Sequence, residues 1–343
     1  MLEIILKILF IIVINLSIVA YLVLVERKVC ALIQNRYGPN RVGPQGLLQP
    51  VADIVKLFFK EDIVPNDANK FVHSLAPIIS IIVAFSTFAV IPFGDTINIF
   101  GTEIKLLIAD VNVGVLYLLA LASIGVYGIT LSGWASNNKY SLLGGLRSSA
   151  QMISYELSMG LSIVGVIMVA GSFQLDAIVQ KQGGLILGFI PTWNIFLQPI
   201  GFVTFLVSAF AETNRLPFDL PEAEPELIGG YHTEYTGMKF GLFFLAEYSN
   251  MITASALIVT LYFGGWQIPF LPADTFSPFV FALLKMFAFA LKVLLTLLFF
   301  IIIRWTLPRF RYDQLMNIGW KVMFPAAIVN IIIVGGLILL GIL

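Results

Sequence analysis

Long apolar stretches recur along this chain, and they constrain its fold more than any other feature. A transmembrane helix needs about 20 apolar residues to cross about 30 Å of hydrocarbon. Stretches of this length lie at about residues 2–25, 72–93, 108–133, 153–172, 185–210, 238–263, 278–303 and 321–342. The sequence therefore predicts an all-α polytopic membrane protein, a single membrane domain over residues 1–343 with eight transmembrane helices.

The composition excludes several classes of protein. Only 12% of the residues are charged and 59% are apolar, whereas soluble domains carry about 25% charged residues. Basic and acidic residues balance at 20 each, so no basic excess is available to neutralise nucleic-acid phosphates. One cysteine and two histidines argue against a metal or iron–sulfur site, and no G-x-G-x-x-G or P-loop motif is found. We therefore expect any flavin, iron–sulfur cluster or metal to reside in partner subunits.

The basic residues predict the orientation in the membrane. The first, third, fifth and seventh loops and their flanks hold fifteen of the twenty Lys and Arg residues, and the opposite side holds three. By the positive-inside rule, these odd-numbered loops face the inner side and both termini face the outer, periplasmic side. The absence of a targeting peptide favours a bacterial cell inner membrane, with an organelle inner membrane as the alternative.

The first inner loop contains a second kind of helix. After a G-P-N-R-V-G-P turn, apolar residues fall on one face of a helix over about 46–60, and Asp53, Lys56 and Lys60 fall on the other. A helix this short and amphipathic is expected to lie along the membrane surface. It is either a simple interfacial anchor or the frame of a cavity mouth for an amphipathic ligand.

Acidic residues gather in the fifth inner loop, AETNRLPFDLPEAEPELIGGYHTEYTGMKF. They are Glu212, Asp219, Glu222, Glu224, Glu226 and Glu234. Such a run is often only a solvated loop, but the prolines and glycines between the acids indicate a shaped turn. Closely spaced carboxylates also favour proton exchange near neutral pH.

Ionisable residues also lie inside the predicted spans. Glu156 falls just inside span four, Glu247 in span six and Lys292 in span seven. Charges at such depth are costly and indicate function by default. Glu247 and Lys292 lie at similar depth, which is compatible with a buried ion pair between them.

Four long motifs resemble one known family. They are ERKVCALIQNRYGPNRVGPQGLLQPVADIVKLFFKE, GGLRSSAQMISYE, ETNRLPFDLPEAEPELIGGYHTEYTGMKFGLFFLAEYSNM and RWTLPRFRYDQLMNIGWK. In this order, and over nearly the whole chain, they are similar to the signature loops of the H-subunit family of NADH:quinone oxidoreductase, the membrane subunits of respiratory complex I at the junction with the peripheral arm.

The resemblance implies a subunit of a proton-translocating enzyme, not catalytic alone, that forms the entrance and wall of a quinone chamber. Quinone would be a substrate, and the partners would be the bilayer, the peripheral-arm quinone-site subunits, one with the terminal iron–sulfur cluster, and small membrane subunits leading to antiporter-like ones. The residues that match the chamber motifs are Glu26, Arg27, Gln34, Arg36, Arg41, Asp53, Lys56, Phe218 and Asp219. Those that match the coupling acids are Glu156, Glu212, Glu222, Glu224, Glu226 and Glu247.

Two other classes of function remain open at this point. A self-sufficient cation or proton transporter would use the buried acids as its substrate site, although the inverted repeat typical of such transporters is not visible. A purely structural adaptor would dock peripheral proteins without any need for the acids. The type of quinone and the electron donor are not encoded in any motif of this chain.

Overall fold

The computed structural model describes residues 2–99, 102–186, 188–221, 224–271 and 277–342 of the chain. Within them, 7 helices are long and apolar enough to cross a membrane. These are α1 (Leu2–Ile33), α3 (Lys70–Ser86, continued by the 3-10 turn η2, Thr87–Val90), α4 (Gly114–Ala135), α5 (Lys139–Ala170), α10 (Gly237–Tyr262), α11 (Pro278–Thr306) and the continuous run α12 (Tyr312–Asn317), η5 (Ile318–Met323) and α13 (Phe324–Leu339). The expectation of a helical polytopic membrane protein is confirmed in this form.

The span expected at 185–210 is wrong over its first half. Residues Leu185–Ile186 and Ile190–Pro191 pair as a hairpin, β3–β4, and are followed by α7 (Asn194–Leu197) and α8 (Pro199–Glu212). Gln198 has φ −141° between the two helices, and Pro199 is favoured in the first turn of a helix and disfavoured in its interior. The 14 residues of α8 give a length of about 21 Å, which is short of the hydrocarbon thickness.

Two other boundaries differ from the apolar stretches. Helix α5 begins at Lys139, so the third inner loop is mostly helical, and α4 begins only at Gly114. A hairpin of β1 (Thr96–Ile99) and β2 (Thr102–Lys105) precedes α4. Hydropathy marks the part of a helix that lies in lipid, and it does not mark where the helical hydrogen bonds begin.

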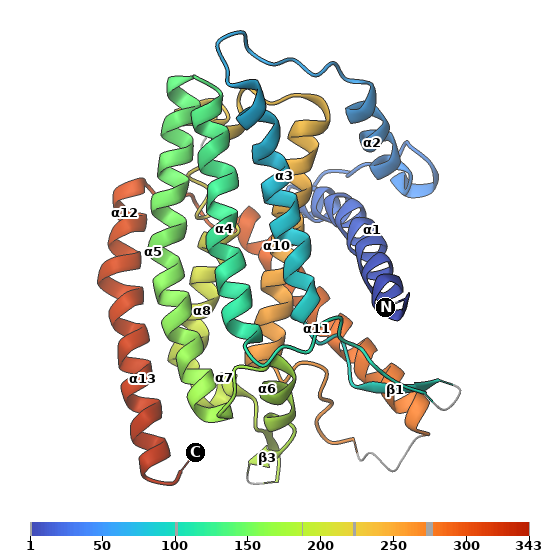
Figure 1. The fold of residues 1–343 in the computed structure, drawn as a ribbon, viewed down its shortest axis with the longest axis vertical. Helices are drawn as coiled ribbons and strands as arrows, with labels where there is room; N and C mark the ends of the chain where they lie inside the picture. Colours follow the sequence, from blue (N-terminus) through green and yellow to red (C-terminus); the bar gives the residue numbers. More distant parts are fainter. Residues whose placement is uncertain (1, 100–101, 187, 222–223, 272–276, 343) are drawn as a thin grey trace.

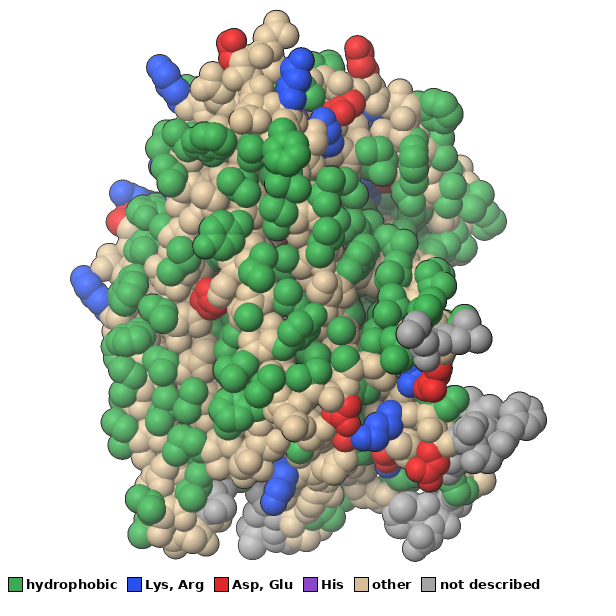
Figure 2. All heavy atoms as spheres, viewed as in Figure 1, with side chains coloured by type: hydrophobic (Ala, Val, Ile, Leu, Met, Phe, Trp, Pro, Cys, Tyr) green, Lys and Arg blue, Asp and Glu red, His purple; other side chains and the backbone are tan. Residues whose placement is uncertain are grey.

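The long helices form one bundle with a splayed edge (Figure 1). Helices α3, α4, α5 and α10 lie side by side, α13 flanks α5, and α1 leans away on the opposite side. Both chain ends lie away from α2 (Gln49–Phe59), the short helix beside the end of α1. Hydrophobic side chains cover most of the middle of the face in Figure 2, and charged ones concentrate toward its upper and lower ends.

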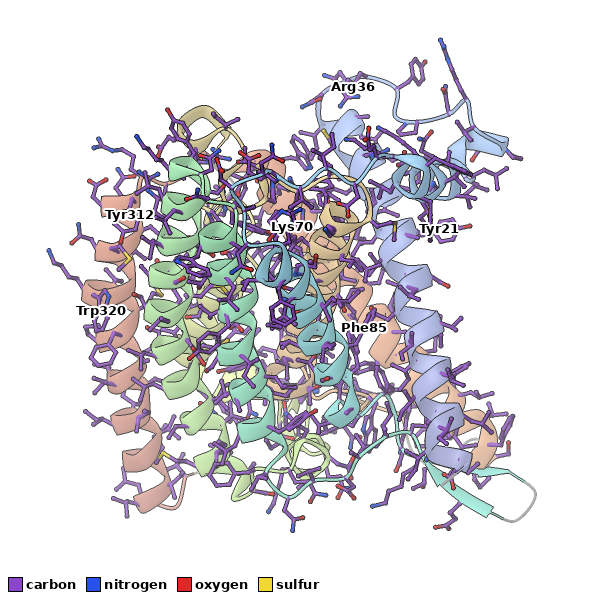
Figure 3. The ribbon with its side chains drawn as sticks, turned by 45° about the horizontal axis from the view of Figure 1, so that its top comes forward. Tyr21, Arg36, Lys70, Phe85, Tyr312 and Trp320 are labelled. Atoms are coloured by element: carbon purple, nitrogen blue, oxygen red, sulfur yellow. The ribbon has the colours of Figure 1, made fainter. Side chains whose placement is uncertain are left out.

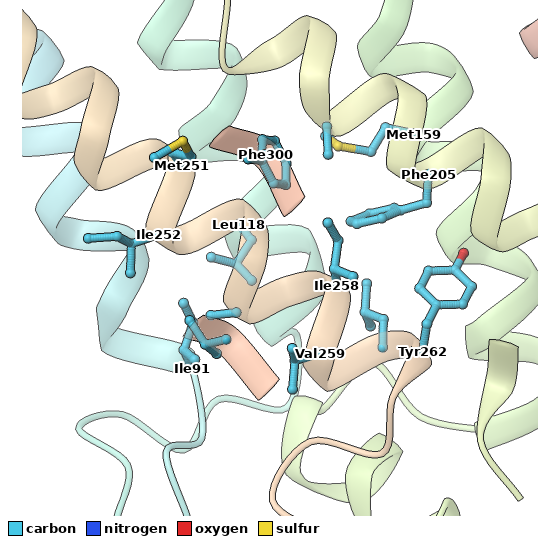
Figure 4. Packing of buried hydrophobic residues seen from close by; sticks show 14 of the residues in the cluster. Ile91, Leu118, Met159, Phe205, Met251, Ile252, Ile258, Val259, Tyr262 and Phe300 are labelled. Atoms are coloured by element: carbon cyan, nitrogen blue, oxygen red, sulfur yellow. The ribbon is translucent and has the colours of Figure 1, made fainter. Parts of the chain in front are cut away.

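The core is built from large side chains on α5, α8, α10 and α11 (Figure 4). Phe205 and Tyr262 are fully buried, and their ring centroids lie 5.5 Å apart. The Tyr262 hydroxyl donates to the carbonyl of Gly201 at 3.1 Å, so the polar end of this ring is satisfied. This packing fixes α8 against α10, and both helices carry acidic residues of the site described next.

Candidate functional site

Glu26 is buried near the inner end of α1, with 5% of its surface exposed. The Tyr248 hydroxyl donates to its Oε2 at 2.6 Å, and Nη1 of Arg215 lies 3.4 Å from both carboxylate oxygens. Arg304, from the last turn of α11, also pairs with this carboxylate. One carboxylate on α1 thus holds together the fifth inner loop, α10 and α11.

Arg215 links this carboxylate to a second one. Its Nε lies 2.7 Å from Oε1 of Glu247, and its Cζ lies 4.1 Å from the centre of the Tyr248 ring. Burial by itself would lower the pKa of Arg215, but the neighbouring carboxylates of Glu247 and Glu26 raise that pKa above its ordinary value. Arg215 therefore stays charged, and two acids balance two arginines, as buried charges require. We call Glu26, Arg215, Glu247, Tyr248 and Arg304 the ionic network.

A cavity extends from the ionic network into the bundle, between α3, α4, α5, α8 and α10. Its volume is about 100 Å³, and a water molecule needs about 10–15 Å³, so the cavity has room for several. Most of its lining is apolar, but several polar side chains also line it. These include Ser80, Thr87, Glu212, Asn214, Glu247, Asn250 and Thr253.

Two carboxylates, Glu212 and Glu247, line the same cavity from different helices. Glu156 lies on α5, which packs against α8, and it accepts a hydrogen bond from Ser123 on α4. Carboxylates separated by hydroxyls and space for water can exchange protons along a chain. The structure therefore places two of the predicted acids on one cavity, and the third, Glu156, on a helix that borders it.

The fifth inner loop is held against α5 by specific contacts. Nε2 of Gln151 donates to the carbonyl oxygens of Ala211 and Phe218, each at 2.7 Å. A Cβ at Gly144 would lie 2.8 Å from the backbone of Gly230, so this approach needs glycine. Helix α5 thus provides a side-chain donor, Gln151, and a glycine, Gly144, that lets the loop backbone approach closely. Together they give the loop a defined conformation against α5.

Other predicted residues of the fifth loop have separate partners. Asp219 is buried and pairs with Arg309 at 2.7 Å, while Glu226 pairs with Arg147 at 2.7 Å across an exposed edge. The buried Phe218 ring packs edge-on to Tyr155 at 5.4 Å. Glu222 lies outside the described residues, as does the side chain of Glu224 at the start of α9 (Glu224–Leu227).

The first inner loop has the predicted short helix. Helix α2 spans Gln49–Phe59, and its Asp53 pairs with Arg27 at the end of α1 at 2.8 Å. Apolar side chains of α2, such as Phe58 at 66% exposed, point away from the protein core, as expected of a helix at a membrane surface.

The remaining predicted residues of this loop lie outside the ionic network. Gln34, Arg36, Arg41 and Lys56 are exposed. Arg36 lies in the connection above α1 (Figure 3) and donates to Oε1 of Gln34 at 2.7 Å. All four side chains are accessible from outside the chain.

The Glu247–Lys292 pair is wrong. Glu247 faces Arg215, whereas Nζ of Lys292 donates to the carbonyl oxygens of Phe263, Gly265 and Gln267 at 2.9, 2.9 and 2.8 Å. Similar depth in two helices does not fix which faces meet, and the end of α10 turns back over Lys292.

Arg215, Arg304 and Tyr248 are members of the ionic network that were not predicted from the sequence. In the sequence, Arg304 counts only as one of the basic residues that predict the membrane orientation. Basic side chains at the ends of spans usually extend to the membrane–water interface. One signal did exist for Arg215, because it is the only base between residues 212 and 226. Within the described part of the chain, no group of three or more His, Cys, Asp and Glu side chains is placed to hold a metal ion.

Comparison with known proteins gives consistent matches. Residues 6–335 match the family model described as NADH dehydrogenase. The NADH-quinone oxidoreductase H subunit 1 of Cytophaga hutchinsonii is 53% identical over 327 residues, which cover 95% of this chain and 94% of the relative. The NADH-quinone oxidoreductase subunit 8 of Rhodothermus marinus is 54% identical over 321 residues, with 91% and 90% covered. The NADH-quinone oxidoreductase H subunit of Thermomicrobium roseum is 54% identical over 330 residues, with 95% and 93% covered.

Proposed function

Because the chain belongs to the NADH dehydrogenase family, we propose that it is a membrane subunit of a proton-pumping NADH:quinone oxidoreductase. It carries no redox chemistry of its own and is not catalytic alone. Its partners are the peripheral subunits that hold the redox centres, the neighbouring membrane subunits and the lipid bilayer. The bacterial inner membrane is the proposed location.

We infer an eight-span topology in which α7 and α8 together make the fifth crossing. Both chain ends lie away from α2 (Figure 1), which is compatible with an even number of crossings. The 7 long helices plus α8 give that number. Both termini then face the outer side, as the distribution of basic residues predicts.

The rim of the quinone chamber is assigned to the first and fifth inner loops. The exposed Gln34, Arg36, Arg41 and Lys56 offer donors at an open edge beside α2, and the apolar face of α2 offers contact for an isoprenoid tail. The Arg27–Asp53 pair fixes α2 against α1. Phe218 and Asp219 border the same chamber from the fifth loop.

The coupling role rests on one observation, the shared cavity. Glu247 belongs both to the ionic network and to the cavity that Glu212 lines. A negative charge formed on quinone near the loops shifts the balance of a network with two acids and two arginines, and Glu247 carries that shift to Glu212 and Glu156. The acids at Glu222, Glu224 and Glu226 are proposed as the loop-side end of this path.

The proposal is tested with neutral replacements in the assembled complex. Glu212→Gln and Glu247→Gln keep the shape of each side chain and remove its charge. We expect each to lower quinone reduction and proton pumping together in inverted membrane vesicles. Glu103→Gln, an exposed acid in the β1–β2 hairpin, serves as the matched control and leaves both rates unchanged.

Two results would contradict the proposal. Normal reduction and pumping in both variants would show that the acids are structural, as an adaptor would have them. Purification of the chain alone, active as a proton or cation carrier in liposomes, would favour a self-sufficient transporter.

A further inference from the structure

Lys292 is a half-buried lysine that the proposed function does not use. It lies in the middle of α11, and its ammonium group donates to three backbone carbonyls at 2.8–2.9 Å. An ammonium has three N–H donors, so the three carbonyls satisfy it completely. The face of the Trp193 ring lies 4.5 Å from Nζ, which adds a cation–π contact.

The three carbonyls belong to the end of α10 and the turn beyond it. Phe263 caps the C-terminal end of α10, where a helix carries a partial negative charge, and Gly265 and Gln267 lie in the turn beyond it. The chain then reverses through Gly264 and Gly265, with φ +69° and +52°, and this turn aims the carbonyls at Lys292. A Cβ at Gly265 would lie 2.6 Å from the Val179 side chain, so the turn needs glycine at this position.

The clamp joins the two helices that carry part of the ionic network. Helix α10 carries Glu247 and Tyr248, and α11 carries Arg304, 12 residues after Lys292. That separation is about 18 Å along a helix. A shift of α10 along α11 therefore moves Glu247 and Tyr248 relative to Arg304.

We propose that Lys292 is a positioning residue, which sets the register of α10 against α11 so that their side chains converge on Glu26 and Arg215. This inference rests on the proposed coupling role of the ionic network. It assigns a role to a charged residue within a membrane span, where an ionisable group is costly.

Lys285 provides a matched comparison on the same helix. It lies 7 residues before Lys292, pairs with Asp95 at 2.5 Å and faces the Trp266 ring at 4.6 Å. It anchors an outer loop, and the three carbonyls at the end of α10 are bound by Lys292 instead. Loss of Lys285 thus removes a similar charge and its contact with Trp266 but leaves the three hydrogen bonds from Lys292 to the turn after α10 in place.

The test uses the assembled complex with Lys292→Met, Lys285→Met, Glu247→Gln and the double variant Lys292→Met/Glu247→Gln. Misplacement of reacting groups by about 1 Å can cost about 100-fold in rate, and we expect Lys292→Met to lower quinone reduction by about tenfold. Electron transfer to an artificial acceptor that bypasses the quinone site stays normal. Lys285→Met stays within about twofold of the unmodified complex.

The double variant distinguishes positioning from general damage. If Lys292 acts through Glu247, the double variant is no slower than Glu247→Gln alone, because coupled residues are not additive. The inference would be overturned if the losses in quinone reduction of the two single variants multiplied in the double variant. It would also be overturned if Lys285→Met lost as much quinone reduction as Lys292→Met. Normal activity of Glu247→Gln would instead refute the proposed function. If Lys292→Met does not assemble, Lys292→Gln, whose amide still donates to carbonyls, is measured in the same cycle.

Discussion

Removal of the Arg215 charge is the sharpest test of the ionic network. Arg215→Met keeps much of the side-chain volume but deprives Glu247 of its ion pair at 2.7 Å. Glu26 keeps Arg304 and the Tyr248 hydroxyl. The variant therefore removes an ion-pair partner chiefly from one carboxylate, that of Glu247.

The magnitude follows from the burial of the pair. Side chains of Arg215 and Glu247 are 3% and 13% exposed, and breaking a buried pair by removing one partner costs about 3–5 kcal/mol. At about 2 °C per kcal/mol for a large chain, the melting temperature falls by about 6–10 °C. The assay heats membranes and follows the intact complex by native electrophoresis.

Two control variants sharpen the interpretation. Arg311→Met removes a cation whose pair with Asp313 is 77% and 62% exposed, and we expect no measurable change. The double variant Arg215→Met/Glu247→Gln removes the uncompensated charge and regains part of the lost stability. A melting temperature for Arg215→Met equal to that of Arg311→Met would refute the reasoning, because the buried charges would then contribute nothing to the fold.

Three further predictions concern how α5 and α2 hold the loops. Gly144→Ala forces a methyl group against the backbone of Gly230, 2.8 Å away, and should lower quinone reduction, whereas Gly160→Ala on the same helix meets nothing within 4 Å and should not. Gln151→Leu deprives two backbone carbonyls of this donor and should lower the stability of the complex by about 1–3 kcal/mol, seen as a lower melting temperature. Arg27→Ala breaks a half-exposed ion pair with α2 and should cost less than about 1 kcal/mol, so a large loss of assembly would contradict that estimate.

Hydropathy predicts the long helices of this fold well, because the bilayer imposes their length. It fails at α8, where the residues are apolar but Gly188, Pro191 and Pro199 break the helix into a hairpin and two short pieces. It also misses the start of α5, since the inner turns of that helix are polar. Apolar content measures the environment of a segment and not its backbone conformation.

The candidate site is predictable as a set of residues but not as a set of contacts. The acidic residues Glu156, Glu212 and Glu247 can be identified as candidates from the sequence, because charged residues are rare inside the spans. Their partners do not, since Arg215 meets Glu247 across 32 residues of chain and Arg304 meets Glu26 across 278. Lys292 shows the limit most clearly, because its partners are backbone carbonyls that no side-chain pattern reveals.

The central claim is that a buried carboxylate on the cavity responds to quinone reduction. Redox-induced infrared difference spectroscopy of the assembled complex measures this in the carboxyl C=O stretching region. We predict a carboxyl signal on quinone reduction that disappears in Glu212→Gln and remains in Glu103→Gln. An unchanged signal in Glu212→Gln, with quinone reduction intact, would contradict the account.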